Sequence, residues 1–400
     1  MKGNVANGGV PGRIAFIHYP YGATCWIEAR PFAFNVVKRL AESGWRVDLF
    51  LAEQQLPHIE SFCSSNKIRL FYVQKTNTGI MGRRLESLFL ILRFAIRRGY
   101  RCVFTAGQTA AFLGALVAHS SRCPLVYLND EFPSFWGQGL RTRLEGWAAR
   151  RADLIVMPDQ EDGLRYPELA RELGLPPGTF HVDIPNTPLI GRVIDTNYDW
   201  HARLGIPSGM KILLYAGTLC DAMQVPEILS SVPHWPRGAA LLLHSHTGTS
   251  LSAVQNQFSH LTQGFPVFWS SEILADDEFN SLVAYVDGCF ALYRSTGPNL
   301  DLIGMSSGKL MRSLACGTPV IASHQESLAF VENYGLGFQV RHPVDIPRAI
   351  EKLLEGREDW RNRCKEFCLK GAGSFDGGWA RLCVTSPIAL GGLDLCDPCS

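Results

Sequence analysis

From Arg13 onward the sequence alternates short apolar runs, rich in β-branched and aromatic residues, with longer segments whose apolar positions recur at helical spacing. This alternation is typical of parallel sheets whose strands are joined by crossover helices. In the first half the predicted strands are RIAFIHYP, RVDLFLA, IRLFYVQ, RCVFTAG, PLVYLND and DLIVMPD, and the predicted helices span 31–43, 81–98, 108–120 and 140–151. Together they predict one doubly wound α/β domain over residues 1–190.

The alternation breaks once and then starts again. Residues 185–207 contain prolines and glycine but few periodic apolar positions, so we place an interdomain linker at 191–207. The strands predicted beyond it are KILLYAG, AALLLHSH, PVFWSS, GCFALYR, PVIAS and GFQV, with helices at 276–285, 306–316 and 344–354. They predict a second α/β domain over 208–372, followed by a glycine-rich tail at 373–400. Two such domains facing each other form a cleft, in which ligands bind beyond the carboxyl ends of the strands.

Length and composition agree with two folded domains. The chain has 400 residues, of which 46% are hydrophobic and 19% charged, and one core rarely grows beyond about 250 to 300 residues. No apolar run reaches the ~18 to 20 residues needed to cross a bilayer. The 12 cysteines are scattered and residues 1–12 carry no apolar signal segment, so we expect reduced thiols in a cytoplasmic protein. Cys396 and Cys399 have no second cysteine pair or histidine nearby, and no metal site is predicted.

The clearest chemical pattern lies in residues 290–323, FALYRSTGPNLDLIGMSSGKLMRSLACGTPVIAS. It joins a strand, a loop of small polar residues, a helix that opens at SSGK, and a Gly-Thr-Pro turn before another strand. A helix N-terminus offers unpaired N–H groups and a positive dipole end, which suit a diphosphate, and a lysine in the first turn adds a full charge. The predicted phosphate site is Ser306, Ser307, Gly308 and Lys309. The alternative is a plain serine N-cap followed by a solvated lysine.

The segment SSGKLMRSLACGTPVIASHQESLAFVENYGLGFQV resembles the C-terminal domain of GT-B glycosyltransferases, in particular the large retaining group 1, or family 4-like, superfamily. ARRADLIVMPDQEDGLRYPELARELGLPPGTFHVDIPNTP is similar to the end of their N-terminal domain, and the resemblance covers residues 13–370. It implies two facing Rossmann-like domains with an interdomain cleft. It also implies transfer of a sugar, with retention of configuration, from a nucleoside diphosphate sugar to a glycan, lipid-linked or small-molecule acceptor, with no further cofactor and no nucleic acid.

The resemblance assigns donor residues in two loops, but this sequence also departs from the family pattern. In YAGTL it places Gly217 and Thr218 beside the phosphate or sugar, although glycine would serve a simple strand-to-helix turn equally well. In SSEIL it assigns base binding to Ile273. Many members of the family carry a Glu-x7-Glu pair, but the matching residues here are Gly304 and Arg312.

A further departure concerns the charge that opposes the donor phosphates. The segment GTLCDAMQ lacks the Arg and Lys that often follow the first strand of the donor domain, so we assign neutralisation to Lys309, Arg294 and Arg312. These departures keep a second interpretation open, a non-catalytic GT-B subunit that binds a partner enzyme. A nucleotide-sugar 2-epimerase shares the architecture but needs several acids and bases around the sugar, and no comparable cluster follows the donor-domain strands.

Acceptor chemistry is predicted on the N-terminal side. The strand in PLVYLNDEF ends where the family places a His or carboxylate next to the sugar, so Asp130 and Glu131 are predicted catalytic residues that orient the acceptor hydroxyl or accept its proton. Turn or helix-cap roles are the alternative. The loop HYPYGATCWIEARPF combines aromatic rings with polar groups that suit a sugar or lipid-linked acceptor. Its candidate acceptor residues are His18, Tyr19, Glu28 and Arg30.

Charge is distributed unevenly along the chain. The net charge is +1, but residues 1–150 hold 19 Lys and Arg against 9 Asp and Glu. The segment MGRRLESLFLILRFAIRRGYR, at 81–101, combines an apolar stripe at helical spacing with six arginines. The stripe fits a crossover helix packed on the sheet, whereas the arginines attract anionic lipid at roughly 1 kcal/mol per charge. We therefore expect weak, salt-sensitive contact between the N-terminal domain and an anionic membrane, peripheral at the inner face.

Overall fold

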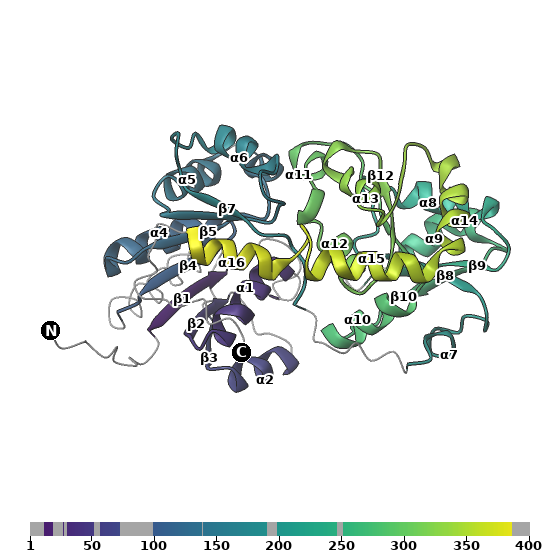
Figure 1. The fold of residues 1–400 in the computed structure, drawn as a ribbon, viewed down its shortest axis with the longest axis horizontal. Helices are drawn as coiled ribbons and strands as arrows, with labels where there is room; N and C mark the ends of the chain where they lie inside the picture. Colours follow the sequence, from purple (N-terminus) through teal and green to yellow (C-terminus); the bar gives the residue numbers. More distant parts are fainter. Residues whose placement is uncertain are drawn as a thin grey trace.

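The computed structural model describes residues 12–18, 27, 30–51, 57–72, 99–137, 139–189, 198–245 and 251–385. Within these ranges the chain forms two α/β bodies that lie side by side (Figure 1). Each body is a parallel sheet covered by helices on both faces. The prediction of two facing Rossmann-like domains is therefore confirmed. The predicted helix at 81–98 lies outside the described residues.

The N-terminal sheet has the strand order β3-β2-β1-β4-β5-β6-β7. Its strands are β1 (Arg13–His18), β2 (Arg46–Leu51), β3 (Ile68–Tyr72), β4 (Cys102–Ala106), β5 (Leu125–Leu128), β6 (Leu154–Met157) and β7 (His181–Asp183). Successive residues of β1 enter opposite cores, because side chains alternate across a strand: Phe16 packs on one face and Ile17 on the other. Burial on both faces explains why the strands read as continuous apolar runs rather than as alternating ones.

Helices cover both faces of this sheet. The first face carries α1 (Pro31–Glu42) and α2 (Pro57–Ser65), and the second carries α4 (Gln108–Ser121), α5 (Leu140–Ala149) and α6 (Arg165–Leu173). A short 3-10 turn, η2 (Pro133–Trp136), follows β5. Strand β7 was not predicted, because its three residues are too few to show a period.

The C-terminal sheet has the strand order β10-β9-β8-β11-β12-β13. Its strands are β8 (Lys211–Ala216), β9 (Ala239–His244), β10 (Val267–Ser270), β11 (Gly288–Ala291), β12 (Val320–Ser323) and β13 (Gly337–Val340). The helices are α7 (Trp200–Leu204), α8 (Val225–Ser231), α9 (Leu251–Thr262), α10 (Asp276–Tyr285), α11 (Pro298–Asp301), α12 (Gly308–Ala315), α13 (Phe330–Asn333), α14 (Ile346–Glu355) and α15 (Arg357–Leu369). The 3-10 turns are η3 (Asp221–Met223), η4 (Val232–His234), η5 (Gly304–Ser306), η6 (Glu326–Leu328) and η7 (Pro343–Asp345).

The second domain begins before residue 208, where the sequence pattern placed its start. Helix α7 precedes β8, and its Trp200 is fully buried in the core of the C-terminal domain. The indole Nε1 donates to Ser281 Oγ on α10 at 3.2 Å. Part of the predicted linker, 191–207, therefore belongs to the donor-side core.

The predicted tail, 373–400, contains a helix that returns to the first domain. Helix α16 (Phe375–Thr385) crosses between the two bodies (Figure 1), and its Phe375, Trp379 and Leu382 are buried in the N-terminal core. The glycines of this helix weaken its apolar period, so the sequence did not predict it. They also allow the helix to pack closely against the N-terminal domain, since a Cβ on Gly378 would lie 3.0 Å from the Cα of Ile184. The N-terminal core is thus completed by the end of the described chain.

We expect Trp379→Ala to destabilise the protein by about 3 to 5 kcal/mol, because it removes a large side chain from a core that only partly collapses. Urea unfolding followed by tryptophan-independent circular dichroism measures the loss. Val384→Ala is the matched control, since Val384 lies on the same helix and is 79% exposed. Equal, small effects of both substitutions would contradict the packing of α16 on the N-terminal core.

Candidate functional site

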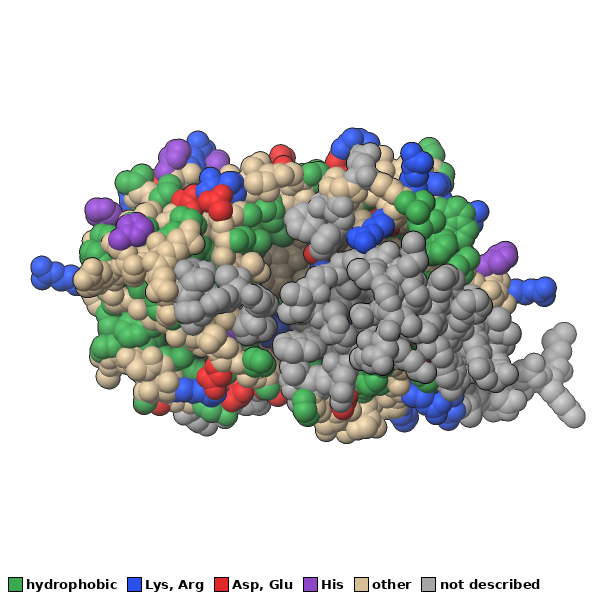
Figure 2. All heavy atoms as spheres, turned by 180° about the vertical axis from the view of Figure 1, so that it is seen from behind, with side chains coloured by type: hydrophobic (Ala, Val, Ile, Leu, Met, Phe, Trp, Pro, Cys, Tyr) green, Lys and Arg blue, Asp and Glu red, His purple; other side chains and the backbone are tan. Residues whose placement is uncertain are grey.

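The two sheets place their carboxyl ends toward the junction of the domains. In each sheet the strand order reverses at the first strand, β1 in one domain and β8 in the other. Such reversal points open the crevices in which α/β proteins bind ligands. Figure 2 shows a recess between the two halves on the face that it draws. The candidate site is formed by His18 at the end of β1, by Arg30 before α1, and by the residues that follow β5, β8 and β11.

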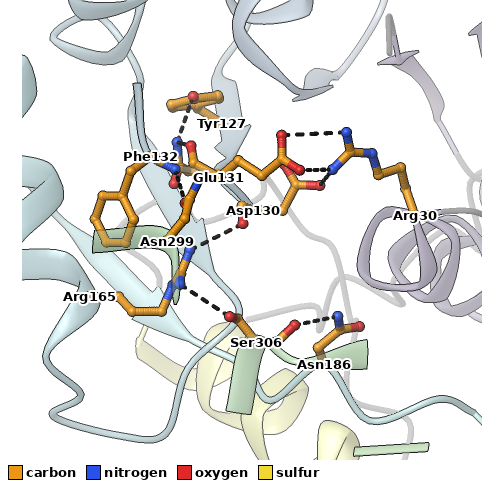
Figure 3. Close-up of polar contacts among 10 residues, drawn as sticks. Arg30, Tyr127, Asp130, Glu131, Phe132, Arg165, Asn186, Asn299 and Ser306 are labelled. Atoms are coloured by element: carbon orange, nitrogen blue, oxygen red, sulfur yellow. Dashed lines mark hydrogen bonds and ion pairs between the residues drawn. The ribbon is translucent and has the colours of Figure 1, made fainter. Parts of the chain in front are cut away.

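Asp130 and Glu131 follow β5, and both carboxylates bind one arginine. Arg30, the residue before α1, places Nη1 at 2.6 Å from Glu131 Oε1 and at 3.3 Å from Asp130 Oδ2 (Figure 3). Burial opposes the charge of Arg30, but the two carboxylates hold its pKa above the ordinary value. The structure therefore brings together three residues that the sequence assigned to catalysis and to the acceptor. We refer to Asp130 and Glu131 as the acidic turn.

His18 ends β1 beside this ion pair and is 3% exposed. Neither ring nitrogen makes a hydrogen bond of good geometry within the described part of the chain. Burial lowers the pKa of His18 to about 4; Asp130 opposes this shift, and Arg30 adds to it. The imidazole is consequently neutral at physiological pH. Tyr19 and Glu28, the other two acceptor candidates, lie outside the described residues.

A buried polar network, formed by Gln108, Tyr127, Asn129 and Glu145, lies directly behind the acidic turn. Asn129 Nδ2 donates to Tyr127 Oη at 2.9 Å and to the carbonyl of Glu131 at 3.1 Å, and Tyr127 donates to Glu145 Oε1. Glu145 is fully buried, and this burial raises its pKa to about 8. The sequence pattern gave no sign of this network.

Arg165 joins the two domains at the site. Its Nη1 donates to the carbonyl of Leu302 at 3.0 Å and to Ser306 Oγ at 3.1 Å, and its Nη2 donates to the carbonyl of Asp130 at 3.1 Å (Figure 3). The guanidinium also lies 4.6 Å from the ring centroid of Phe132. Burial lowers the pKa of Arg165 to about 10, which leaves the group charged. Sequence analysis missed Arg165 because an arginine at the start of a helix carries no signal of such contacts.

Two asparagines reinforce this junction. The backbone N–H of Phe132 donates to Asn299 Oδ1 at 2.6 Å. Asn186 donates through Nδ2 to the carbonyl of Ser306 at 2.9 Å, and its backbone N–H donates to the carbonyl of Met305 at 3.0 Å. Ser306, predicted to bind phosphate, is thus occupied by contacts with the N-terminal domain.

The predicted phosphate helix is α12, and Ser307 is its N-cap. Ser307 Oγ accepts from the N–H of Leu310 at 3.2 Å, as the alternative interpretation expected. The start of this helix faces the N-terminal domain: a Cβ on Gly308 would lie 3.4 Å from Asn186 Nδ2 and 3.5 Å from Pro31 Cγ. Because Pro31 follows Arg30, the N-terminus of α12 and the acidic turn approach the same junction.

Lys309 reaches back over the strand ends of its own domain. Its ammonium lies 4.5 Å from the ring centroid of Tyr215, at the end of β8, and 4.7 Å from that of Tyr293, after β11. It also lies 3.4 Å from Tyr215 Oη and 3.7 Å from Met223 Sδ. Within the described ranges no carboxylate lies at ion-pair distance from Lys309, and burial lowers its pKa to about 7.

The remaining donor candidates lie in loops. Gly217 follows β8 with a φ of 135°, a value that favours glycine, and a Cβ there would meet only Tyr215 Oη, at 3.9 Å. The carbonyl of Thr218 accepts from Tyr215 Oη at 2.6 Å. Ile273, in the loop after β10, is 55% exposed. Base binding by Ile273 therefore stays a prediction.

The two arginines assigned to the phosphates are already paired. Arg294 binds Asp221 at 3.1 Å and also binds Glu227. Arg312 binds Asp276 Oδ1 at 2.6 Å and Asn280 Oδ1 at 2.7 Å. Of the three cations that the sequence assigned to the donor phosphates, Lys309 alone lacks a described carboxylate partner.

The residues that the structure describes contain no group of three or more His, Cys, Asp or Glu arranged to hold a metal ion. They also contain no helix that is both long and apolar enough to span a bilayer. Cys396 and Cys399 are not among them, and neither are residues 81–98 of the basic segment 81–101 on which the expected membrane contact rests.

No protein-family model matches the sequence, and no curated protein matches it. Solved structures do match the fold. HepE from Anabaena, in complex with UDP and glucose, superposes with a TM-score of 0.67 at 14% identity and covers 91% of this chain and 95% of its own. Sucrose-phosphate synthase from Thermosynechococcus elongatus gives 0.62 at 17% identity, over 92% and 94% of the two chains. UDP-GlcNAc 2-epimerase from Neisseria meningitidis, bound to UDP-GlcNAc, gives 0.58 at 13%, over 92% and 97%. These likenesses establish the GT-B fold.

We expect Arg165→Met to weaken the junction of the domains by about 2 to 5 kcal/mol, because it leaves buried carbonyls unpaired on both sides. Small-angle scattering should show a larger radius of gyration, and urea unfolding a lower midpoint. Arg171→Met is the control: Arg171 lies on the same helix, and its guanidinium pairs with Glu168 at the surface. If both variants keep the dimensions and stability of the parent chain, Arg165 does not hold the domains together.

Proposed function

We propose that this GT-B chain transfers a sugar from a nucleoside diphosphate sugar to a glycan, lipid-linked or small-molecule acceptor, with retention of anomeric configuration. The observation that carries the proposal is Lys309, a cation with no described carboxylate partner, held over the reversal point of the donor-side sheet. The neighbours that bind UDP, UDP-glucose or UDP-GlcNAc are of the same fold, and they support a nucleotide-sugar donor.

The proposed role of Lys309 is to bind the diphosphate and to stabilise it as it departs. An ammonium between two tyrosine rings is poorly hydrated, so a phosphate that reaches it gains a strong charge-assisted hydrogen bond. The N–H groups of Gly308 and Lys309 open helix α12 and add partial positive charge at the start of the helix that carries Lys309. Negative charge develops on the leaving diphosphate in the transition state, where such groups accelerate the reaction.

The proposed role of the acidic turn is to orient the acceptor hydroxyl. Arg30 binds both Asp130 and Glu131 and offsets one of their two negative charges, which favours hydrogen-bond acceptance over strong basicity. The carbonyl of Asp130 and Ser306 Oγ bind the same guanidinium, so acceptor-side and donor-side groups are held in one frame. A frame of this kind supplies proximity and orientation.

A nucleotide-sugar 2-epimerase is the second candidate, because epimerases that act on UDP-GlcNAc share the fold. Incubation with UDP-GlcNAc followed by proton NMR distinguishes the two: an epimerase inverts C2 of the intact nucleotide sugar, whereas a transferase releases UDP only when an acceptor or water receives the sugar. The anomeric coupling in the transferred product tests retention.

We expect Lys309→Met to weaken binding of UDP-glucose by about 10- to 150-fold, because a charge-assisted hydrogen bond contributes about 1.5 to 3 kcal/mol. Methionine keeps the apolar stem between the rings, which protects the fold. Isothermal calorimetry measures the affinity, and Lys352→Met, on α14 of the same domain, is the control. Unchanged affinity in Lys309→Met would remove the central claim.

The same site predicts a pH dependence. Only the ammonium form of Lys309 binds phosphate well, and its pKa in the free protein is about 7. Affinity for UDP-glucose, whose phosphates do not titrate in this range, should therefore be constant at acid pH. Above about pH 7 it should fall by up to tenfold per pH unit, since binding then takes up a proton. Lys309→Met should bind weakly with no such decline.

We expect Glu131→Gln and Asp130→Asn to lower kcat for sugar transfer with little change in donor affinity, since the acidic turn is proposed to act on the acceptor. A decrease of about 100-fold is expected when a group that orients a reactant is lost. Steady-state kinetics with varied donor and acceptor give both quantities. Parallel losses of donor binding and of turnover would indicate a structural role instead.

A further inference from the structure

The network behind the acidic turn contains a carboxyl group for which the proposed reaction has no direct use. Glu145 lies on α5 and is fully buried. Its Oε1 accepts from Tyr127 and, at 3.4 Å, from Asn129 Nδ2, while its Oε2 has no partner of good geometry. The side chain of Gln108, on α4, lies close enough to act on this carboxyl group. Neither of its own amide atoms makes a good hydrogen bond.

The charges around Glu145 disfavour its ionised form. Those that act on it from neighbouring elements are Glu172 on α6 and Asp130 after β5, and both repel a negative charge. In the described part of the chain no Lys, Arg or His lies at ion-pair distance from its carboxylate. An unpaired buried charge costs far more than a neutral acid, so the proton is retained. Hydrogen bonds from Tyr127 and Gln108 favour the ionised form, but burial outweighs them.

Asn129 connects the protonated Glu145 to the main chain of the acidic turn. Asn129 binds Tyr127 Oη and Glu145 on one side and the carbonyl of Glu131 on the other. The next N–H along the chain, that of Phe132, donates to Asn299 of the other domain. The main chain of the acidic turn is therefore fixed from behind by Asn129 and from the front by the donor domain.

We propose that Glu145 is a positioning residue, which as a neutral acid holds Asn129 and thereby fixes the acidic turn against the donor domain. The proposal rests on the proposed function for its link to catalysis, but not for its structural content. When Glu145 loses its proton at alkaline pH, Oε2 carries buried negative charge without a hydrogen bond of good geometry. This charge must attract water or displace its neighbours, and the turn loosens. Glu145→Gln keeps a neutral group of the same shape and removes the titration.

Two measurements test the structural content without any substrate. Infrared difference spectra should show a protonated carboxyl band that disappears with a midpoint near pH 8 and that is missing in Glu145→Gln. Hydrogen exchange of peptides spanning 129–132, compared between the two proteins at one pH, should be equal at neutral pH and several-fold faster in the parent chain above the midpoint. Glu168→Gln, on the neighbouring α6, should behave as the parent chain does.

Kinetics test the link to catalysis. The kcat of the parent chain should fall above the same midpoint. Its donor affinity should show no decline beyond the one that the titration of Lys309 causes. In Glu145→Gln the alkaline decline of kcat should be absent. Glu145→Ala should lower kcat by about 10- to 100-fold, as misplaced groups do, without weakening UDP binding. If Glu145→Ala does not fold, the comparison with Glu145→Gln at alkaline pH decides. A missing carboxyl band, or equal exchange at alkaline pH, overturns the proposal. If the parent chain transfers no sugar, the proposed function fails while these two readouts still judge Glu145.

Discussion

The buried guanidinium of Arg165 sets the constraint on which the rest of the site depends. A charge without a carboxylate in contact is costly to bury and is tolerated only where its donors are satisfied. Here Nη1 and Nη2 donate to carbonyls and a hydroxyl from both domains, so these donors find their partners only when the domains are docked. Asp159 supports the arrangement from below, because its carboxylate accepts from the N–H of Arg165. Together with the contacts of Asn186 and Asn299, Arg165 fixes the relative position of the acidic turn and helix α12.

Helix α1 distributes the same constraint over a wider area. Arg30 at its start binds the acidic turn, and Asn35 donates to a carbonyl of the chain that crosses into the second domain. Lys38 binds Asp276 of the donor side at 3.3 Å, and Arg39 binds helix α16. The apolar side of the helix packs into the N-terminal core. One helix therefore contacts the catalytic candidates, both crossings and the opposite domain.

The sequence predicted the elements better than the contacts. Strands buried on both faces produce apolar runs that no loop imitates, which is why the described strands were found, except the short β7. Helix α16 was missed because its glycines weaken the apolar period that its packing requires. The resemblance led to Lys309, but not to the pairing of Arg294 and Arg312 with carboxylates. Arg165 and Glu145 were missed because burial and partners, and not residue type, give them their properties, and those emerge only when distant segments meet.

The chain passes from the first domain to the second and returns to the first with α16, and this path affects folding during synthesis. Residues 211–340 supply every strand of the second sheet in one continuous stretch, whereas the first core lacks Phe375, Trp379 and Leu382 until α16 has been synthesised. During translation the second domain can therefore close its sheet while the first, although it emerges earlier, still exposes the apolar groove that α16 will cover. Vectorial synthesis thus delivers the N-terminal domain before the second one and completes its core afterwards, a reversal of the usual order in which domains mature on the ribosome.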